Sequence, residues 1–592
     1  MLFGKHINRY YLRHLPRLLL GIVALVAVDI MQLKIPELYA MVINGMDQGT
    51  VTFGGATVPF DLTFLLDHIC MDMVWIILAM VSGRFLWRIC FIGTAIRIET
   101  DLRERMFDRC RKLSQNFYRH SKIGDLMSLF TNDLDTIQEC FAWGVLMFFD
   151  AAFLGGLAIF KMYRMDRGLT LLCLIPMSFL LVASALLGRY MQKKWDIRQA
   201  AFSRLSDFTQ ERFSGLAVIK AFVKEAHELM AFRKLNEENE KANMDHTQAS
   251  VLMRILVMLF VESVICVILG YGGTLVHRGT FNAGQLMEFM GYFSAVIWPI
   301  MAVSELIDMT SRGKASLDRI GHLLDQVPDI TDRPTVRDIP IRGQIAADHL
   351  TFRYPDADCD ALTDLSFTIG AGEHVGIIGR TGSGKSTLAD LLMRMNEAPE
   401  GSLSIDGTDV THLPLQTLRK AVAFVPQDDF LFSDTIARNI AFSHVDAPMD
   451  RIRDAAKLAQ VHDNISGFDR GYETVLGERG VTVSGGQKQR ISIARALITE
   501  APILVMDDSV SAVDTATERQ ILQALRTSRP DKTTILISHR VSSIRELDKL
   551  LFLEDGRLTA VGTHAELYEH CPSYRRMVDL QKLDEEGGDL NG

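Results

Sequence analysis

The first 310 residues carry nearly all the long apolar segments of the chain, and this uneven distribution constrains the fold more than any other feature. An α-helix needs about 20 residues to cross roughly 30 Å of hydrocarbon, and six segments are long enough. The remaining residues alternate short Val/Ile/Leu runs with glycine-rich turns. We therefore predict a membrane bundle followed by a soluble domain, with six spans at 18–44, 72–95, 143–163, 169–191, 251–275 and 284–309.

The composition fits two kinds of domain in one chain. A length of 592 residues exceeds one domain, and 48% hydrophobic residues with a mean hydropathy of +0.13 indicate apolar spans averaged with a soluble part. The net charge of -9 argues against a nucleic-acid partner, which normally needs a basic face. The eight cysteines are scattered without a CxxC pair, so we interpret them as reduced thiols and expect no metal cluster.

Positive charges predict the orientation of the bundle. Residues 5–17 are rich in Arg, and the apolar run that follows has no small-residue cleavage site, which indicates a first span rather than a signal peptide. The long connections 97–122 and 189–241 are rich in Lys and Arg, so we place them in the cytoplasm. The short hairpins 164–168 and 277–283 then lie outside, although the first of them carries basic residues against this rule.

The two long connections are polar and helical in pattern, which predicts helices that continue from the membrane into the cytosol. We expect each connection to end in a short turn, near 124–128 and near 211–215. Arg84 and Arg88 lie four residues apart inside the second predicted span, so they share one helix face. They either line a wet cavity or snorkel to the membrane surface.

A phosphate-binding loop marks the soluble part. The sequence from Gly379 to Ser386 fits the pattern GxxxxGK[ST], after a strand-like run that ends at Ile378 and before a helical run that begins at Thr387. Backbone amides of such a loop surround phosphate oxygens, Lys385 would neutralise the outer phosphates, and Ser386 would give an oxygen to magnesium. This loop predicts a nucleotide site.

Two further segments belong to the same site. The strand-like run 503–506 ends in Asp507, which is placed to reach the magnesium shell. Between the two lies Ser484-Gly485-Gly486-Gln487, a small-residue turn that opens a helix and offers a second anion-binding end. Two phosphate-binding ends in one domain indicate that two domains share each nucleotide.

From about residue 341 to 580 these motifs occur in the order found in the nucleotide-binding domain of ATP-binding cassette (ABC) transporters, which the region resembles. The match also includes an aromatic residue, a Val-Pro-Gln segment, a D-loop at 511–514 and an Ile-Ser-His-Arg segment. The first half is similar to the six-span domain of ABC exporters. Weaker matches are Asn132-Asp133 near a coupling helix and Glu478-Arg479-Gly480, which resembles the exporter X-loop.

The resemblance implies roles for individual residues. Tyr354 would stack on adenine, Gln427 would link magnesium to the membrane domain, and His539 would be the switch histidine. The implied catalytic residues are Asp508, His539 and Gln427, and the implied magnesium ligands are Ser386, Gln427 and Asp507. The implied ATP-binding residues are Tyr354, Gly379, Arg380, Thr381, Gly382, Ser383, Gly384, Lys385, Ser386, Thr387, Gln427, Ser484, Gly485, Gly486 and Gln487.

Asp508 departs from the family pattern, in which a Glu normally polarises the attacking water. Its side chain is one methylene shorter, on the order of 1.5 Å. A general base must reach hydrogen-bond distance of its proton, so ATP binding should survive while hydrolysis falls. Heterodimeric bacterial exporters pair one such half with a half that keeps the Glu. His539 is nevertheless retained, which leaves a slowly hydrolysing homodimer as the alternative.

The resemblance predicts a half-exporter in a bacterial cell membrane that uses ATP and Mg²⁺ and pairs with a second, different half-transporter. We expect a membrane domain at 1–325, a linker at 326–340, a cassette at 341–580 and a tail at 581–592. The expected substrate is an amphipathic drug or lipid-like molecule, and the expected mechanism is alternating access. An importer and a ligand-sensing regulator with the same architecture remain open alternatives.

Overall fold

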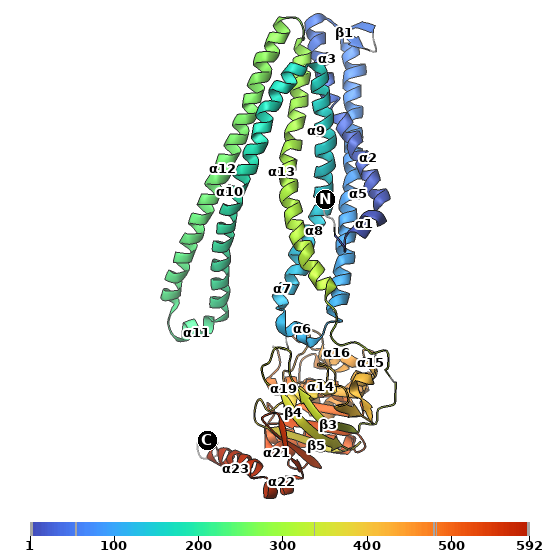
Figure 1. Ribbon diagram of the computed structural model, residues 1–592, viewed down its shortest axis with the longest axis vertical. Coiled ribbons are helices and arrows are strands. Elements are labelled where there is room, and N and C mark those ends of the chain that lie inside the picture. Colours follow the sequence, from blue (N-terminus) through green and yellow to red (C-terminus); the bar gives the residue numbers. More distant parts are fainter. Residues whose placement is uncertain (1–3, 54–55, 337, 478–479, 481, 589–592) are drawn as a thin grey trace. The chain divides into compact units, whose positions relative to one another are not determined.

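The computed structural model describes residues 4–53, 56–336, 338–477, 480 and 482–588. Contacts divide the chain into two units (Figure 1). The first comprises Met1–Arg111 and Ile123–Gln326, and the second comprises Lys112–Lys122 and Val327–Gly592. A short segment from the first half of the sequence therefore packs with the second unit.

The first unit is a bundle of long helices with a small β-hairpin between α3 and α4. Its longer helices are α2 (Leu15–Gln32), α3 (Ile35–Gln48), α5 (Met71–Cys110), α9 (Val145–Met165), α10 (Arg167–Ser214), α12 (Glu225–His277) and α13 (Ala283–Asp325). Its short helices are α1 (Asn8–Arg13), α4 (Leu62–Phe64), α7 (Ile123–Ser128), α8 (Leu134–Glu139) and α11 (Leu216–Ala221). Three π-helical segments are η1 (Leu65–Cys70), η2 (Leu129–Asp133) and η3 (Cys140–Gly144), and the hairpin strands are β1 (Thr50–Phe53) and β2 (Ala56–Pro59).

Five stretches of helix are long and apolar enough to cross a membrane among the residues that the structure describes. They contain five of the six predicted spans, and the first is broken between α2 and α3. The sixth prediction, 169–191, falls within α10, but the side chains at 177 and 180–189 lie outside the described part. The predicted membrane-bundle fold is confirmed.

The helix ends agree with both predicted external hairpins. Asp166 caps α10 by accepting a hydrogen bond from Leu169 N at 2.6 Å. Asn282 and Gln285 form a reciprocal capping box at the start of α13. These caps satisfy backbone N–H groups that would otherwise have no partner at a helix start.

The first predicted cytosolic turn lies earlier than 124–128. Gly124 is inside α7, whereas the chain breaks between α5 and α7 around a short helix, α6 (Gln115–His120). Ser114 and Ser121, which flank α6, have extended backbone conformations and so end the helical path on both sides. The prediction placed the break at the glycine, but a single glycine can continue a helix at a cost of about 1 kcal/mol.

The second turn falls at Gly215, as predicted, and is followed by α11. The helices on either side, α10 and α12, contain 48 and 53 residues. At 1.5 Å per residue they are about 72 and 80 Å long, well beyond a membrane thickness. They run side by side to a tip at α11 (Figure 1). The tip exposes apolar side chains. These are Phe213, Leu216, Val218, Phe222 and Val223.

The centre of the second unit is a six-stranded sheet in the order β12-β11-β5-β10-β9-β8. Its strands are β5 (His374–Gly379), β8 (Val422–Val425), β9 (Ile503–Asp507), β10 (Thr533–Ser538), β11 (Lys549–Glu554) and β12 (Arg557–Gly562). All neighbours are parallel except the edge pair β11–β12. Strands β5, β9 and β10 are continuous buried runs, as expected for a parallel sheet covered on both faces.

A second sheet, in the order β4-β3-β6-β7, is antiparallel throughout. It is formed by β3 (Ile345–Phe352), β4 (Leu362–Ile369), β6 (Leu403–Ile405) and β7 (Thr408–Asp409). The helices of this unit include α14 (Lys385–Leu392), α15 (Leu415–Ala421), α16 (Ile436–Ile440), α17 (Met449–Leu458), α18 (His462–Ser466), α19 (Gly485–Leu497), α20 (Thr515–Ser528), α21 (Val541–Ile544), α22 (His564–His570) and α23 (Pro572–Gly588). The predicted α/β domain with a helical subdomain is confirmed.

Candidate nucleotide site

Four neighbouring parallel strands place the predicted nucleotide residues at one edge of the central sheet. The strands are β5, β10, β9 and β8, and their pairing aligns Ile378 with Ser538, Ile537 with Asp507, and Met506 with Val425. The carboxyl ends are therefore level. The phosphate loop, Asp508, His539 and Gln427 all follow these ends, which is where open α/β sheets bind ligands.

The phosphate loop has the backbone geometry that its glycines predict. Gly382 and Gly384 have φ angles of 84° and 90°, in the left-handed region that favours glycine. A Cβ on Gly384 would lie 2.5 Å from Leu362 Cδ2 and 2.7 Å from Ala361 O, so there is no room for a side chain. Helix α14 starts at Lys385, directly after the loop, and presents its N-terminal N–H groups to an anion.

The Lys385 side chain is held over this loop. Its Nζ donates to Gly379 O at 2.9 Å and to Arg380 O at 2.8 Å, and it reaches Ser383 Oγ at 3.4 Å. The residue is 5% exposed, and burial lowers the pKa of Lys385 to about 8, while Asp507 and Asp508 oppose that shift. The ammonium therefore donates hydrogen bonds to backbone carbonyls, and the phosphate oxygens of ATP would take the place of these carbonyls.

This lowered pKa predicts that ATP binds less tightly at alkaline pH. Phosphates stabilise the charged ammonium, so bound ATP should return the pKa of Lys385 to its ordinary range, and binding above pH 8 should require proton uptake. We expect the dissociation constant of a fluorescent ATP analogue to rise about tenfold between pH 7 and pH 9. The Lys385→Arg variant is the control because a guanidinium stays charged over this range. An equal rise in that variant would contradict the assignment to Lys385.

Two carboxylates follow β9. Asp507 is 5% exposed, and its carboxylate is hydrogen-bonded to the Ser386 side chain. Burial raises the pKa of Asp507, the neighbouring Asp508 carboxylate adds to this, and Lys385 opposes it. Ser386 and Asp507 thus bring two oxygen ligands together, the donor type that Mg²⁺ prefers.

The backbone of Asp508 is fixed on both sides. Its N–H donates to Ile537 O at 2.9 Å, and its carbonyl accepts from Ser511 Oγ at 2.8 Å. Its φ angle of 44° is unusual for a residue with a side chain. Because neighbouring strands and the following turn hold this position, the chain cannot easily advance to compensate for a short side chain.

The other two predicted catalytic residues lie at neighbouring strand ends. His539 follows β10 and interacts electrostatically with Asp507. Gln427 follows β8 and is exposed. The structure therefore brings His539 near Asp507 and leaves Gln427 exposed after the neighbouring strand.

Tyr354 contacts a residue that the sequence analysis did not select. The Arg119 guanidinium of α6 lies 4.8 Å from the Tyr354 ring centre, and the Tyr354 hydroxyl donates to Thr387 Oγ1 at 3.1 Å. Arg119 also approaches Asp390 of α14 at 3.4 Å. Because 112–122 belongs to the second unit, this contact lies within one packed body. It joins the predicted adenine residue to a segment from the first half of the chain.

The small-residue turn at 484–487 caps α19. Ser484 N donates to Gln487 Oε1 at 3.0 Å, and Gln487 N donates to Ser484 Oγ at 3.3 Å. Ser484 and Gly485 are exposed at the helix start. This segment therefore presents a free helix N-terminus, although the Gln487 side chain is used by the cap. Glu478 and Arg479 of the predicted X-loop lie outside the described residues.

Gln489, which the sequence analysis did not select, joins α19 to the D-loop. Its Oε1 accepts from Ala512 N at 3.0 Å, and its Nε2 reaches Asp508 O and Ser511 Oγ, each at 3.5 Å. Gly486, one turn earlier, has no room for a side chain because its Cβ would lie 2.9 Å from Ala512 O. The start of α19 and the turn after Asp508 thus form one rigid assembly. The available signal was the i,i+3 spacing of Gly486 and Gln489.

We expect the Gln489→Ala variant to lower ATP hydrolysis by the assembled transporter about tenfold, because a shift of about 1 Å in reacting groups costs up to 10²-fold. ATP affinity should change less than about threefold, since Gln489 does not line the phosphate loop. Gln489→Glu keeps an oxygen that accepts from Ala512 N but removes the Nε2 donor to Asp508 O and Ser511 Oγ. The two variants together show which of these hydrogen bonds hydrolysis requires. Equal losses of affinity and turnover in Gln489→Ala would contradict a positioning role.

Comparison with known proteins identifies the family. Residues 18–300 match the model of the ABC transporter transmembrane region, and residues 362–511 match that of the ABC transporter. The chain is 34% identical over 588 residues to the probable multidrug resistance ABC transporter ATP-binding/permease protein YheI of Bacillus subtilis, covering 99% of this chain and 98% of that protein. The chain belongs to the ABC transporter family.

Other relatives of this ABC transporter are named for different functions. It is 34% identical over 577 residues to the multidrug resistance-like ATP-binding protein MdlA of Escherichia coli, covering 97% and 96% of the two chains. It is 33% identical over 507 residues to an ATP-dependent lipid A-core flippase of Syntrophus aciditrophicus, covering 85% and 83%. A solved bacterial Atm1-family ABC exporter with ATP bound matches with a TM-score of 0.75 and 26% identity, covering 97% of this chain and 98% of that one.

These findings confirm the resemblance seen in the sequence. The ABC transporter is an exporter-type half-transporter, a multi-pass protein of the plasma membrane in which a membrane domain is fused to an ATP-binding cassette. It binds ATP and couples ATP hydrolysis to export. ABC exporters act as dimers, so this half-transporter works with a second one.

Proposed function

We propose that this chain is the weakly hydrolysing half of a heterodimeric exporter. The single observation that carries the proposal is Asp508 on a fixed backbone. The side chain is about 1.5 Å shorter than Glu, and the hydrogen bonds to Ile537 and Ser511 hold the main chain in place. A water that a Glu would polarise therefore lies out of reach of this carboxylate.

The same chain keeps the groups needed to hold ATP. Lys385, the phosphate loop and the N-terminus of α14 would bind the phosphates, with Tyr354 against the adenine. Ser386 and Asp507, with Gln427 at the next strand end, would hold Mg²⁺, which would neutralise phosphate charge. ATP at this site would act as a clamp between the two cassettes.

The exposed start of α19 gives the chain a second role in the dimer. Its Ser484 and Gly485 would complete the partner's site, where a catalytic Glu performs hydrolysis. The partner is therefore a different half-transporter that carries Glu at the position of Asp508. Gln489 would connect the two sites, because it belongs to α19 and binds the turn after Asp508.

The names of the relatives indicate the class of substrate. Two of the cited relatives are named for multidrug resistance and one for lipid A-core flipping. Both kinds of molecule combine an apolar body with a polar group. We propose an amphipathic drug or lipid-like substrate that moves from the cytoplasmic side outward by alternating access.

The test compares the purified chain with a co-expressed pair of this chain and a half-transporter that carries the Glu. The pair should hydrolyse ATP, and the chain alone should be at least about 10²-fold slower. ATP-dependent substrate uptake into inside-out vesicles tests export, because uptake there corresponds to outward transport in the cell. Substrate-stimulated hydrolysis without uptake would instead support a regulator.

A slowly hydrolysing homodimer is the second candidate, and His539 favours it. This residue remains at the end of β10 and interacts with Asp507, although a site without hydrolysis would not need it. Comparable hydrolysis by the chain alone and by the pair would select the homodimer and reject the clamp role.

A further inference from the structure

A cavity of about 370 Å³ in the first unit contains the only close pair of acidic side chains from two predicted spans among the described cavities. Helices α2, α5, α9 and α13 and the π-helical segment η3 form its walls. Asp29 comes from α2 and Asp150 from α9, and both lie beside Arg84, in the same cavity. Of the two alternatives that the sequence left open for Arg84 and Arg88, the structure supports the cavity, which both residues line.

Only Asp150 of the acidic pair receives a hydrogen bond from a described residue outside the pair. Asp29 is 2% exposed, and its Oδ2 has no partner in the described structure. Its close neighbour Asp150 is another acceptor, which receives one hydrogen bond from Trp298 Nε1 at 2.8 Å. Two carboxylates at such close range, one of them buried, require a shared proton or a positively charged group between them.

The nearby arginines do not fill this role. Arg84 makes its described hydrogen bond to Gln32 Oε1 at 3.5 Å, and the Arg88 guanidinium lies 5.4 Å from the Trp87 ring centre. Neither forms an ion pair with the two aspartates among the described residues. Glu37, another acidic residue of a predicted span, does have its cation, because Lys161 Nζ donates to it.

The same cavity offers aromatic surface. Trp298 and Trp143 line it with 48% and 42% of their surface exposed, so their rings are accessible beside the carboxylates. Indole faces attract cations and pack well against flat apolar groups.

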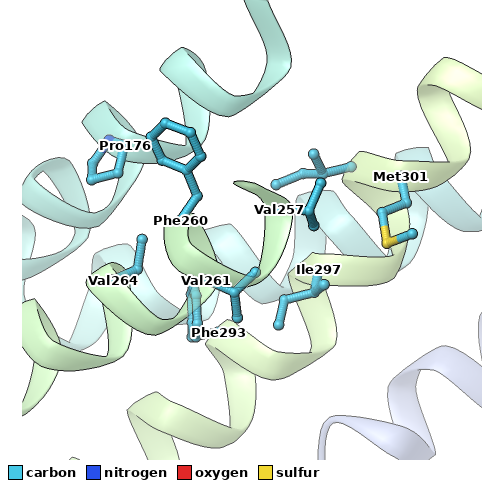
Figure 2. A pocket seen from close by; sticks show the side chains of 9 residues that line it. Pro176, Val257, Phe260, Val261, Val264, Phe293, Ile297 and Met301 are labelled. Carbon is cyan, nitrogen blue, oxygen red and sulfur yellow. The ribbon is translucent and has the colours of Figure 1, made fainter. Parts of the chain in front are cut away.

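A second cavity at membrane level in the described part of the chain has no such chemistry. Figure 2 shows the apolar gap among α10, α12 and α13, with Phe260, Val261, Phe293 and Met301 around it. It holds about 20 Å³, which is room for little more than one water molecule. Its lining offers packing but no group that selects a ligand by charge.

We propose that Asp29, Asp150 and Trp298 form a binding site for an aromatic organic cation. The positive charge of the ligand lies between the two carboxylates and balances their charge, while the flat ring system packs against Trp298 and Trp143. This inference rests on the proposed export function and narrows its substrate class from amphipathic molecules to aromatic cations. Arg84 opposes binding through its charge.

The experiment measures ligand binding without nucleotide, in the full-length chain purified with its partner. Ethidium is the cationic probe, and phenanthridine, its uncharged parent ring, is the matched neutral probe. Asp29→Asn and Asp150→Asn keep the side-chain shape, and each should raise the ethidium dissociation constant about tenfold or more. Phenanthridine binding should stay within about twofold. Asp47→Asn, on the exposed end of α3, is the control acid and should leave both constants unchanged.

Arg84→Gln provides an effect of opposite sign, because removing this positive charge should lower the ethidium dissociation constant. Unchanged ethidium binding in both Asn variants would overturn the site. Equal losses for the two probes would also overturn it and would show that the acidic pair only holds α2 to α9. Ethidium binding without nucleotide could follow the predicted pattern while inside-out vesicles take up no ethidium. That result would reject the export proposal and still support the cation site.

Discussion

Changing Asp508 to Glu is expected to raise ATP hydrolysis at this chain's own site by about 10²- to 10⁴-fold, the range that a well-placed general base contributes. The added methylene moves the carboxylate outward by about 1.5 Å while the backbone stays fixed. Lys385, Ser386 and Asp507 already supply the contacts to phosphate and metal in our proposal. The substitution therefore restores one missing group in a site that is otherwise complete.

The cleanest measurement uses a pair in which the partner's own catalytic Glu has been changed to Gln. Any hydrolysis then comes from the site that contains Asp508. Asp508→Asn is the matched control, and it should cause little further loss because the shorter acid already fails to act as a base. A gain below about threefold for Asp508→Glu, together with a large loss for Asp508→Asn, would show that Asp508 is a working base.

The second large effect is expected from Lys385→Ala, which should raise the dissociation constant for ATP at this site at least about 10²-fold. Its ammonium would bind the outer phosphates through charge-assisted hydrogen bonds in a protected loop, where each is worth about 1.5–3 kcal/mol. Removal also leaves the carbonyls of Gly379 and Arg380 without the donor that they have in the nucleotide-free chain.

Photo-crosslinking of an azido-ATP analogue, quantified separately on each chain of the pair, measures this effect. Label should disappear from this chain and remain on the partner. Thr387→Ser serves as the control at the same helix, because it keeps the hydroxyl that Tyr354 contacts. Undiminished labelling of the Lys385→Ala chain would mean that ATP is held by other groups.

The sequence predicted the architecture because its strongest patterns are local. A run of about 20 apolar residues, or a strand-turn-helix with GxxxxGK[ST], reports its structure without knowledge of distant residues. The phosphate loop, the buried β9 strand and both external hairpins followed directly. The break in the first span was missed although Pro36, in the first turn of α3, lacks the N–H that a continuous helix would donate to Gln32 O. The position of α6 was missed because it depends on backbone preferences at Ser114 and Ser121.

The parts that could not be predicted depend on contacts between distant positions. Asp29 and Asp150 belong to different helices, and neither has a sequence signature. Arg119 looked like one of many basic residues in a cytoplasmic connection until α6 placed it over Tyr354. The roles given to individual nucleotide residues likewise stay predictions, since order and spacing indicate a role and only substitution measures it.

The long α10–α12 hairpin has a consequence for the cell. Its tip exposes Phe213, Leu216, Val218, Phe222 and Val223 to water, the kind of apolar surface that chaperones and proteases recognise. A newly made chain would carry this surface until assembly covers it. We expect unassembled copies to be degraded, so that the amount of finished transporter in the membrane follows the scarcer of the two subunits.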